Sequence, residues 1–172
     1  MIKVTVDRLL LLVISTGAMI LDLHQMRIKN SWILFAFASG IIWKFLEYGL
    51  KGLGGYVIGA IVPLAVLGWM FIFKMLGAGD IKLFCVLGGI MGPRNILLCI
   101  WASFIVGAII SAAIFVSCGG FAERFQYFVL YIKEFLYTRT VKPYCKSKDE
   151  WQNIHFAVPV FMSVLLYVGG IY

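Results

Sequence analysis

The stretch Gly54–Phe73, GGYVIGAIVPLAVLGWMFIF, is twenty residues long and contains no charged side chain. The hydrocarbon core of a bilayer is about 30 Å thick, and about 20 apolar residues in a helix are needed to cross it. This stretch therefore has the length and the composition of a transmembrane helix. It predicts a protein that folds in lipid.

The composition of the whole chain supports this interpretation. Of its 172 residues, 62% are hydrophobic and 13% are charged. A soluble domain has roughly 25% charged residues, so this chain has too few to cover a water-exposed surface. We expect residues 1–172 to form a single all-α membrane domain.

Five further apolar segments bring the predicted transmembrane helices to six. The six segments are Leu9–Leu21, Ser31–Leu46, Gly54–Phe73, Ile81–Met91, Ile96–Ser117 and Ile154–Tyr172. Phe121–Leu136 has apolar side chains on one helical face and charged ones opposite, which is typical of an amphipathic helix in the membrane interface. Gly55 with Gly59 and Gly88 with Gly92 have the spacing that allows helices to pack closely.

Basic residues lie mainly at the ends of the apolar segments, and the net charge is +7. Ten of the fifteen lysines and arginines fall on one side of the six predicted helices, which places that side in the cytoplasm. This distribution suits contact with anionic lipid headgroups, so we expect lipid and no nucleic acid as a partner. The four cysteines have no CxxC spacing, and His24 and His155 are expected at the interface without a metal site.

Two of the eight acidic residues require a different explanation from the rest. Six fall where water or headgroups would solvate them: Asp7, Glu47, Glu123, Glu134, Asp149 and Glu150. Asp22 and Asp80 adjoin apolar segments, and the predicted topology places both at the cytoplasmic edge. A carboxylate close to hydrocarbon is costly and usually has a function.

Two carboxyls that approach each other share a proton near neutral pH, which supplies a base and an acid for peptide hydrolysis. Three alternatives stay open. In the first, Asp80 is an ordinary N-cap of the helix that follows it. In the second, Asp22 is a juxtamembrane charge beside His24 and Arg27. In the third, both acids serve as relays in a small transporter or proton-coupled channel.

The sequence around both acids resembles that of a known family. Gly77-Ala78-Gly79-Asp80-Ile81-Lys82-Leu83 resembles the GxGD signature of type IV prepilin peptidases, with its small-apolar, Lys, Leu continuation. Asp22-Leu23-His24-Gln25-Met26-Arg27-Ile28-Lys29-Asn30 resembles the family's stretch of an Asp, basic residues and Ile-Pro-Asn, with Lys29 in place of the proline. Phe156-Ala157-Val158-Pro159 resembles the start of the family's last helix.

This resemblance implies an intramembrane aspartyl peptidase that removes the short basic leader of prepilin-like precursors at the cytoplasmic face of the cell membrane. It implies catalysis by Asp22 and Asp80 without a cofactor or metal, and it leaves open which of them is the base. The supporting residues that it implies are Gly77, Gly79, Lys82, Arg27 and Asn30.

Lys82 would favour an ionised carboxylate, bind lipid phosphate or be a snorkelling interfacial lysine, whereas Arg27 and Asn30 would orient Asp22 or the substrate. The N-terminal domain with paired CxxC motifs that bifunctional members carry has no counterpart here, so we expect peptidase activity without N-methylation. This minimal form resembles the short peptidases of tight-adherence (Flp) pilus systems. The sequence identifies neither the pilin, nor the scissile bond, nor the oligomeric state.

Overall fold

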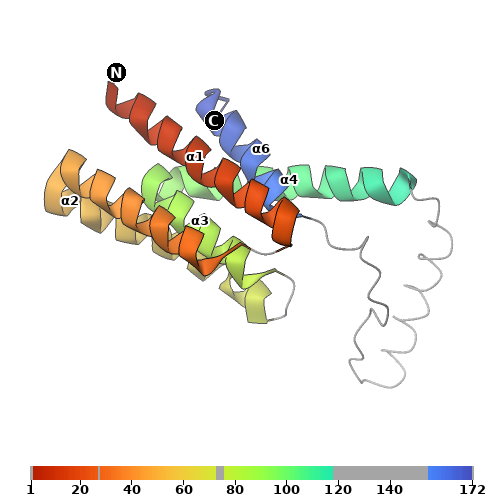
Figure 1. The fold of residues 1–172 in the computed structure, drawn as a ribbon. Coiled ribbons are helices and arrows are strands. Elements are labelled where there is room, and N and C mark those ends of the chain that lie inside the picture. Colours follow the sequence, from red (N-terminus) through yellow and green to blue (C-terminus); the bar gives the residue numbers. More distant parts are fainter. Residues whose placement is uncertain (1, 27, 73–75, 118–154, 172) are drawn as a thin grey trace. The chain divides into compact units, whose positions relative to one another are not determined.

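The computed structural model describes residues 2–26, 28–72, 76–117 and 155–171, which form helices joined by short connections, without a strand (Figure 1). The helices are α1 (Ile2–Gln25), α2 (Asn30–Ile72), α3 (Ala78–Met91), α4 (Pro93–Ser117) and α6 (Ala157–Val168). The predicted all-α fold is therefore confirmed for the described residues. The predicted interfacial helix Phe121–Leu136 lies outside them.

The chain divides into two compact units. The first comprises residues 1–107 and 155–172, and it contains every contact discussed below. The second comprises residues 108–154, of which the structure describes the last part of α4, through Ser117.

Two of the described helices are long and apolar enough to cross a membrane. They are α2, with 43 residues, and α4 over Pro93–Ile114, with 22 residues. The helix α6 is apolar but shorter, with 12 residues, so it covers less of the chain than the predicted Ile154–Tyr172. The number of six transmembrane helices stays a prediction.

The long helix α2 has two arms. Its backbone leaves the helical region at Gly49, where φ is 61° and ψ is −142°, and the chain doubles back there (Figure 1). A positive φ of this kind suits glycine because it has no Cβ. The first arm, residues 30–48, and the second arm, residues 50–72, correspond to the predicted helices Ser31–Leu46 and Gly54–Phe73, but they extend closer to the turn than predicted.

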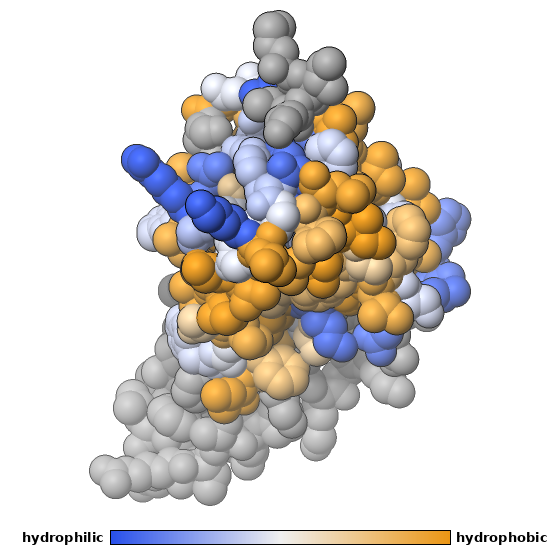
Figure 2. Space-filling view, turned by 90° about the vertical axis from the view of Figure 1, so that its left-hand side faces the viewer, coloured by the Kyte–Doolittle hydropathy of each residue, from blue (hydrophilic) through white to orange (hydrophobic). Residues whose placement is uncertain are grey.

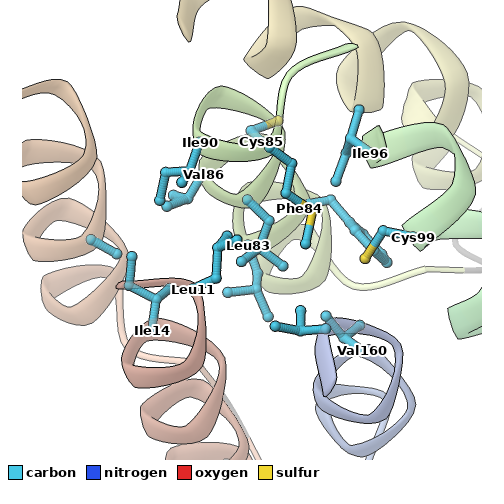
Figure 3. Packing of buried hydrophobic residues seen from close by; sticks show 14 of the residues in the cluster. Leu11, Ile14, Leu83, Phe84, Cys85, Val86, Ile90, Ile96, Cys99 and Val160 are labelled. Carbon is cyan, nitrogen blue, oxygen red and sulfur yellow. The ribbon is translucent and has the colours of Figure 1, made fainter. Parts of the chain in front are cut away.

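The helix α3 forms the centre of the hydrophobic core. Every residue from Leu83 through Met91 is buried, and so is Ile81. In Figure 3, its side chains lie between Leu11 and Ile14 of α1 on one side and α4 and α6 on the other. Neighbouring helices thus cover α3 from Leu83 to Met91, which places this part of it in the interior of the bundle.

Large apolar side chains also cover the outside of the described helices. Leu50 is 82% exposed, Leu34 is 73% exposed and Trp101 is 70% exposed. Figure 2 shows such side chains spread over the face in view. An apolar surface of this extent suits contact with lipid tails, because in water it would cause aggregation.

The second arm of α2 crosses α3 at Gly59 and Gly88. A Cβ built on either glycine would overlap the backbone carbonyl of the other. The prediction of close helix packing is therefore confirmed for these two residues. It is wrong for Gly55 and Gly92, which have no neighbour within 4 Å of a Cβ position; Gly92 instead ends α3 with a φ of 85°.

A cluster of charges joins α1 to the first arm of α2. The Asp7 carboxylate accepts hydrogen bonds from Trp43 Nε1 at 2.8 Å and from Lys44 Nζ at 3.0 Å. Glu47 Oε2 lies 3.6 Å from the same Lys44 nitrogen, and the Glu47 side chain is only 2% exposed. The prediction of solvated charges is therefore wrong for Asp7 and Glu47, because both lie within helices that extend beyond the predicted ends.

We expect Gly59→Ala and Gly88→Ala each to lower the free energy of unfolding by about 1–3 kcal/mol, because the added methyl forces two backbones apart. Thermal unfolding in detergent measures this. The matched control is Gly68→Ala, since Gly68 lies on the same arm as Gly59 and a Cβ there meets nothing within 4 Å. Equal stability of the Gly59 and Gly68 variants would contradict the close crossing.

Lys44→Ala is expected to lower the free energy of unfolding by about 1–3 kcal/mol, because it removes the charged donor of Asp7 and the cation next to the Glu47 carboxylate. The comparison is Lys51→Ala, an exposed lysine of α2, which should change stability by less than about 0.5 kcal/mol. Denaturant unfolding of both variants measures the difference. If the two substitutions cost the same, the cluster does not stabilise the fold.

Candidate active site

Asp22 lies in the last turn of α1. The helix ends at Gln25, and the backbone N–H of Met26 donates to the Asp22 carbonyl oxygen at 2.8 Å. Met26 has a φ of 51°, the left-handed conformation that commonly terminates a helix. The C-terminal end of a helix carries a partial negative charge, so a carboxylate in this turn gains nothing from its own helix.

Asp80 lies in the first turn of α3, and thus at the N-terminal end of a helix, whereas Asp22 lies at a C-terminal end. The helix begins at Ala78, with Gly77 in the N-cap position. The alternative that Asp80 is the N-cap is therefore wrong, because the helix starts three residues before the predicted Ile81. The Asp80 carboxylate folds back over Gly77, and a Cβ on that glycine would come within 2.9 Å of Asp80 Oδ2.

The connection between α1 and α2 is held against the first turn of α3. A Cβ on Gly79 would lie 3.5 Å from the Ile28 side chain, which is an ordinary packing distance. Lys82 Nζ donates to Asn30 Oδ1 at 3.0 Å. These contacts tie the segment that follows Asp22 to the turn that carries Asp80, although about sixty residues separate the two acids in the sequence.

The two carboxyls influence each other electrostatically. Burial, and after it the charge of Asp22, raises the pKa of Asp80 to about 6, while a backbone hydrogen bond from Gly77 opposes the rise. Asp80 precedes the apolar part of α3 and lies outside α2 and α4, the two helices long enough to cross a membrane. An acid shifted in this way is protonated for part of the time near neutral pH.

The structure adds a residue that the sequence did not identify. His155, just before α6, places its Nδ1 atom 3.4 Å from Asp22 Oδ2. The Asp22 side chain is 13% exposed, and its Oδ2 atom has no hydrogen-bond partner among the described residues. The one available signal was position, since His155 immediately precedes the Phe156–Pro159 stretch that carries part of the family resemblance.

The other predicted supporting residues have varied outcomes. Gly77 is the N-cap of α3 and Gly79 lies directly before Asp80, while Lys82 Nζ donates to Asn30 Oδ1. Among the described residues no ion pair joins Lys82 to Asp22 or Asp80. Arg27 lies outside the described part of the chain. Within that part, no group of three His, Cys, Asp or Glu side chains is placed to hold a metal ion.

Taken together, the fold and the site define a helical protein with membrane-compatible helices and two interacting carboxyls at the ends of α1 and α3. The model of the type IV leader peptidase family matches residues 9–112, which include both acids and more than half of the chain. The chain therefore belongs to the type IV leader peptidase family. It is a leader peptidase-like protease of the membrane. No curated protein and no solved structure matches it.

Proposed function

We propose that the protein is an intramembrane aspartyl endopeptidase in which Asp22 and Asp80 form the catalytic pair. The observation that carries the proposal is the electrostatic interaction of two acids from different helices, which helps to raise the pKa of Asp80 toward neutral pH. Membership of the leader peptidase family supports a peptide bond as the target. It also makes a proteolytic role for these carboxyls preferable to a transport role.

The chemistry requires one carboxylate and one carboxylic acid. The carboxylate removes a proton from a water molecule, and the water oxygen attacks the carbonyl carbon of the scissile peptide bond. The carboxylic acid donates its proton to the carbonyl oxygen as the tetrahedral intermediate forms. Collapse of this intermediate breaks the C–N bond, and the amine leaves with a proton returned by the pair, so neither a covalent intermediate nor a cofactor is needed.

The substrates we propose are type IV prepilin-like precursors, each with a short basic leader ahead of an apolar helix. The predicted topology puts the ends of α1 and α3 that carry the acids on the cytoplasmic side, where such a leader would be located before export. An apolar precursor helix would reach these residues through the lipid, since the outer surface of the bundle is apolar. The leader would then be cut at the membrane boundary.

We expect Asp22→Asn and Asp80→Asn each to reduce leader removal by about 10²–10⁴-fold, because an amide neither accepts the proton from water nor donates one to the carbonyl oxygen. The measurement is the conversion of a co-expressed prepilin-like precursor, followed by gel mobility and by mass spectrometry of the new N-terminus. Asn matches Asp in size, so both variants should keep the unfolding temperature of the wild type. Processing at the wild-type rate by either variant would refute the catalytic pair.

Gly77→Ala should lower cleavage by about tenfold or more while leaving the fold intact. The added methyl would come within 2.9 Å of Asp80 Oδ2, the mobile end of a side chain, so the carboxyl moves rather than the backbone. The matched substitution is Gly79→Ala, whose methyl meets Ile28 at an ordinary 3.5 Å and should cost less activity. Steady-state rates and thermal unfolding of both variants separate displacement of the carboxyl from loss of stability. A larger loss of rate in the Gly79 variant would contradict this geometry.

A further inference from the structure

The two carboxyls of the proposed pair have different surroundings. Asp22 Oδ2 is buried without a hydrogen-bond partner among the described residues, and the imidazole of His155 lies 3.4 Å away. Asp80 instead folds over its own N-cap, Gly77. One acid therefore has an imidazole beside it, whereas the other has a contact with the backbone.

His155 is held in place by the packing of the residues that follow it. The Phe156 ring contacts Phe104 of α4 at a centroid distance of 5.4 Å and Phe84 of α3 at 6.2 Å. The helix α6 packs along α1, and Ser163 Oγ donates to the Cys99 carbonyl oxygen of α4 at 2.9 Å. Because α6 is anchored to its neighbours, His155 has a defined position beside the end of α1.

The other charged groups near this end of the bundle face elsewhere. His24 is exposed and lies two residues after Asp22, which places it on a different face of α1. Lys29 is also exposed, and Lys82 of α3 binds Asn30. The described part of α6 contains no acidic or basic residue. Among the described residues, His155 is the charged or titratable side chain in contact with Asp22, and the charge of Asp22 in turn raises the pKa of Asp80.

We propose that His155 is a positioning residue which keeps Asp22 as the ionised member of the pair, so that Asp22 activates the water and Asp80 donates the proton. This inference rests on the proposed function. When two acids share one proton, the negative charge remains on the acid next to a cation. An imidazolium beside Asp22 therefore leaves the proton on Asp80. The base of the pair is then Asp22, and the acid is Asp80.

The test is the pH dependence of kcat/KM for the full chain reconstituted in liposomes with a prepilin-like fusion protein. In His155→Gln, the acidic limb of the profile should move to higher pH by about one unit or more, because the carboxylate loses the charge that keeps it ionised. His155→Lys should restore the wild-type acidic limb, since it returns a cation to that position. The matched control is His24→Gln, which should leave the profile unchanged.

A uniform loss of rate in His155→Gln at all pH values, without a shift, would overturn the inference, because a purely structural role predicts that result. His155→Asn provides the same test if the Gln variant fails to insert. Asp22→Asn and Asp80→Asn are measured in the same assay. If they are inactive while the profile of the His155 variants does not shift, the proposed function stands and the role of His155 is refuted. If they remain active, the proposed function itself fails.

Discussion

The close crossing of the second arm of α2 and α3 at Gly59 and Gly88 is the contact on which the rest of the structure depends. In lipid, burying apolar side chains provides little drive for helices to associate, so backbone proximity and dense packing must supply it. Two glycines that meet without side chains permit that proximity. With α3 held there, α1, α4 and α6 pack around it and cover its remaining faces.

The central position of α3 determines where a polar site can lie. Because α3 is buried from Leu83 to Met91, its polar groups lie in its first turns, where Asp80 is found. The last turn of α1 supplies Asp22, and the start of α6 supplies His155. The three side chains thus come from three separate helix ends: His155 lies 3.4 Å from Asp22, and the charge of Asp22 raises the pKa of Asp80.

The sequence was sufficient for the parts of the fold that depend on apolar length. The two arms of α2 and the end of α3 at Met91 follow from runs of apolar residues. The pairing of Asp22 with Asp80 stays a prediction that rests on the cost of a carboxylate beside such a run. The sequence was insufficient to predict the contact of His155 with Asp22 and the burial of Glu47, because both depend on how separate helices pack. Whether an interfacial histidine points at Asp22, or a glutamate at Lys44, is decided by tertiary packing that periodicity does not encode.

The two aspartates of α1, one near each end, differ in their hydrogen bonding. At the first end, Asp7 has two hydrogen-bond donors, and Lys44 lies near a second carboxylate. At the other end, Asp22 Oδ2 has an imidazole nearby but no hydrogen bond among the described residues. A buried oxygen without a hydrogen bond lowers stability, so its presence needs a compensating benefit. In the proposed mechanism, a free acceptor beside an imidazole provides one, because that oxygen remains available to accept a proton from water.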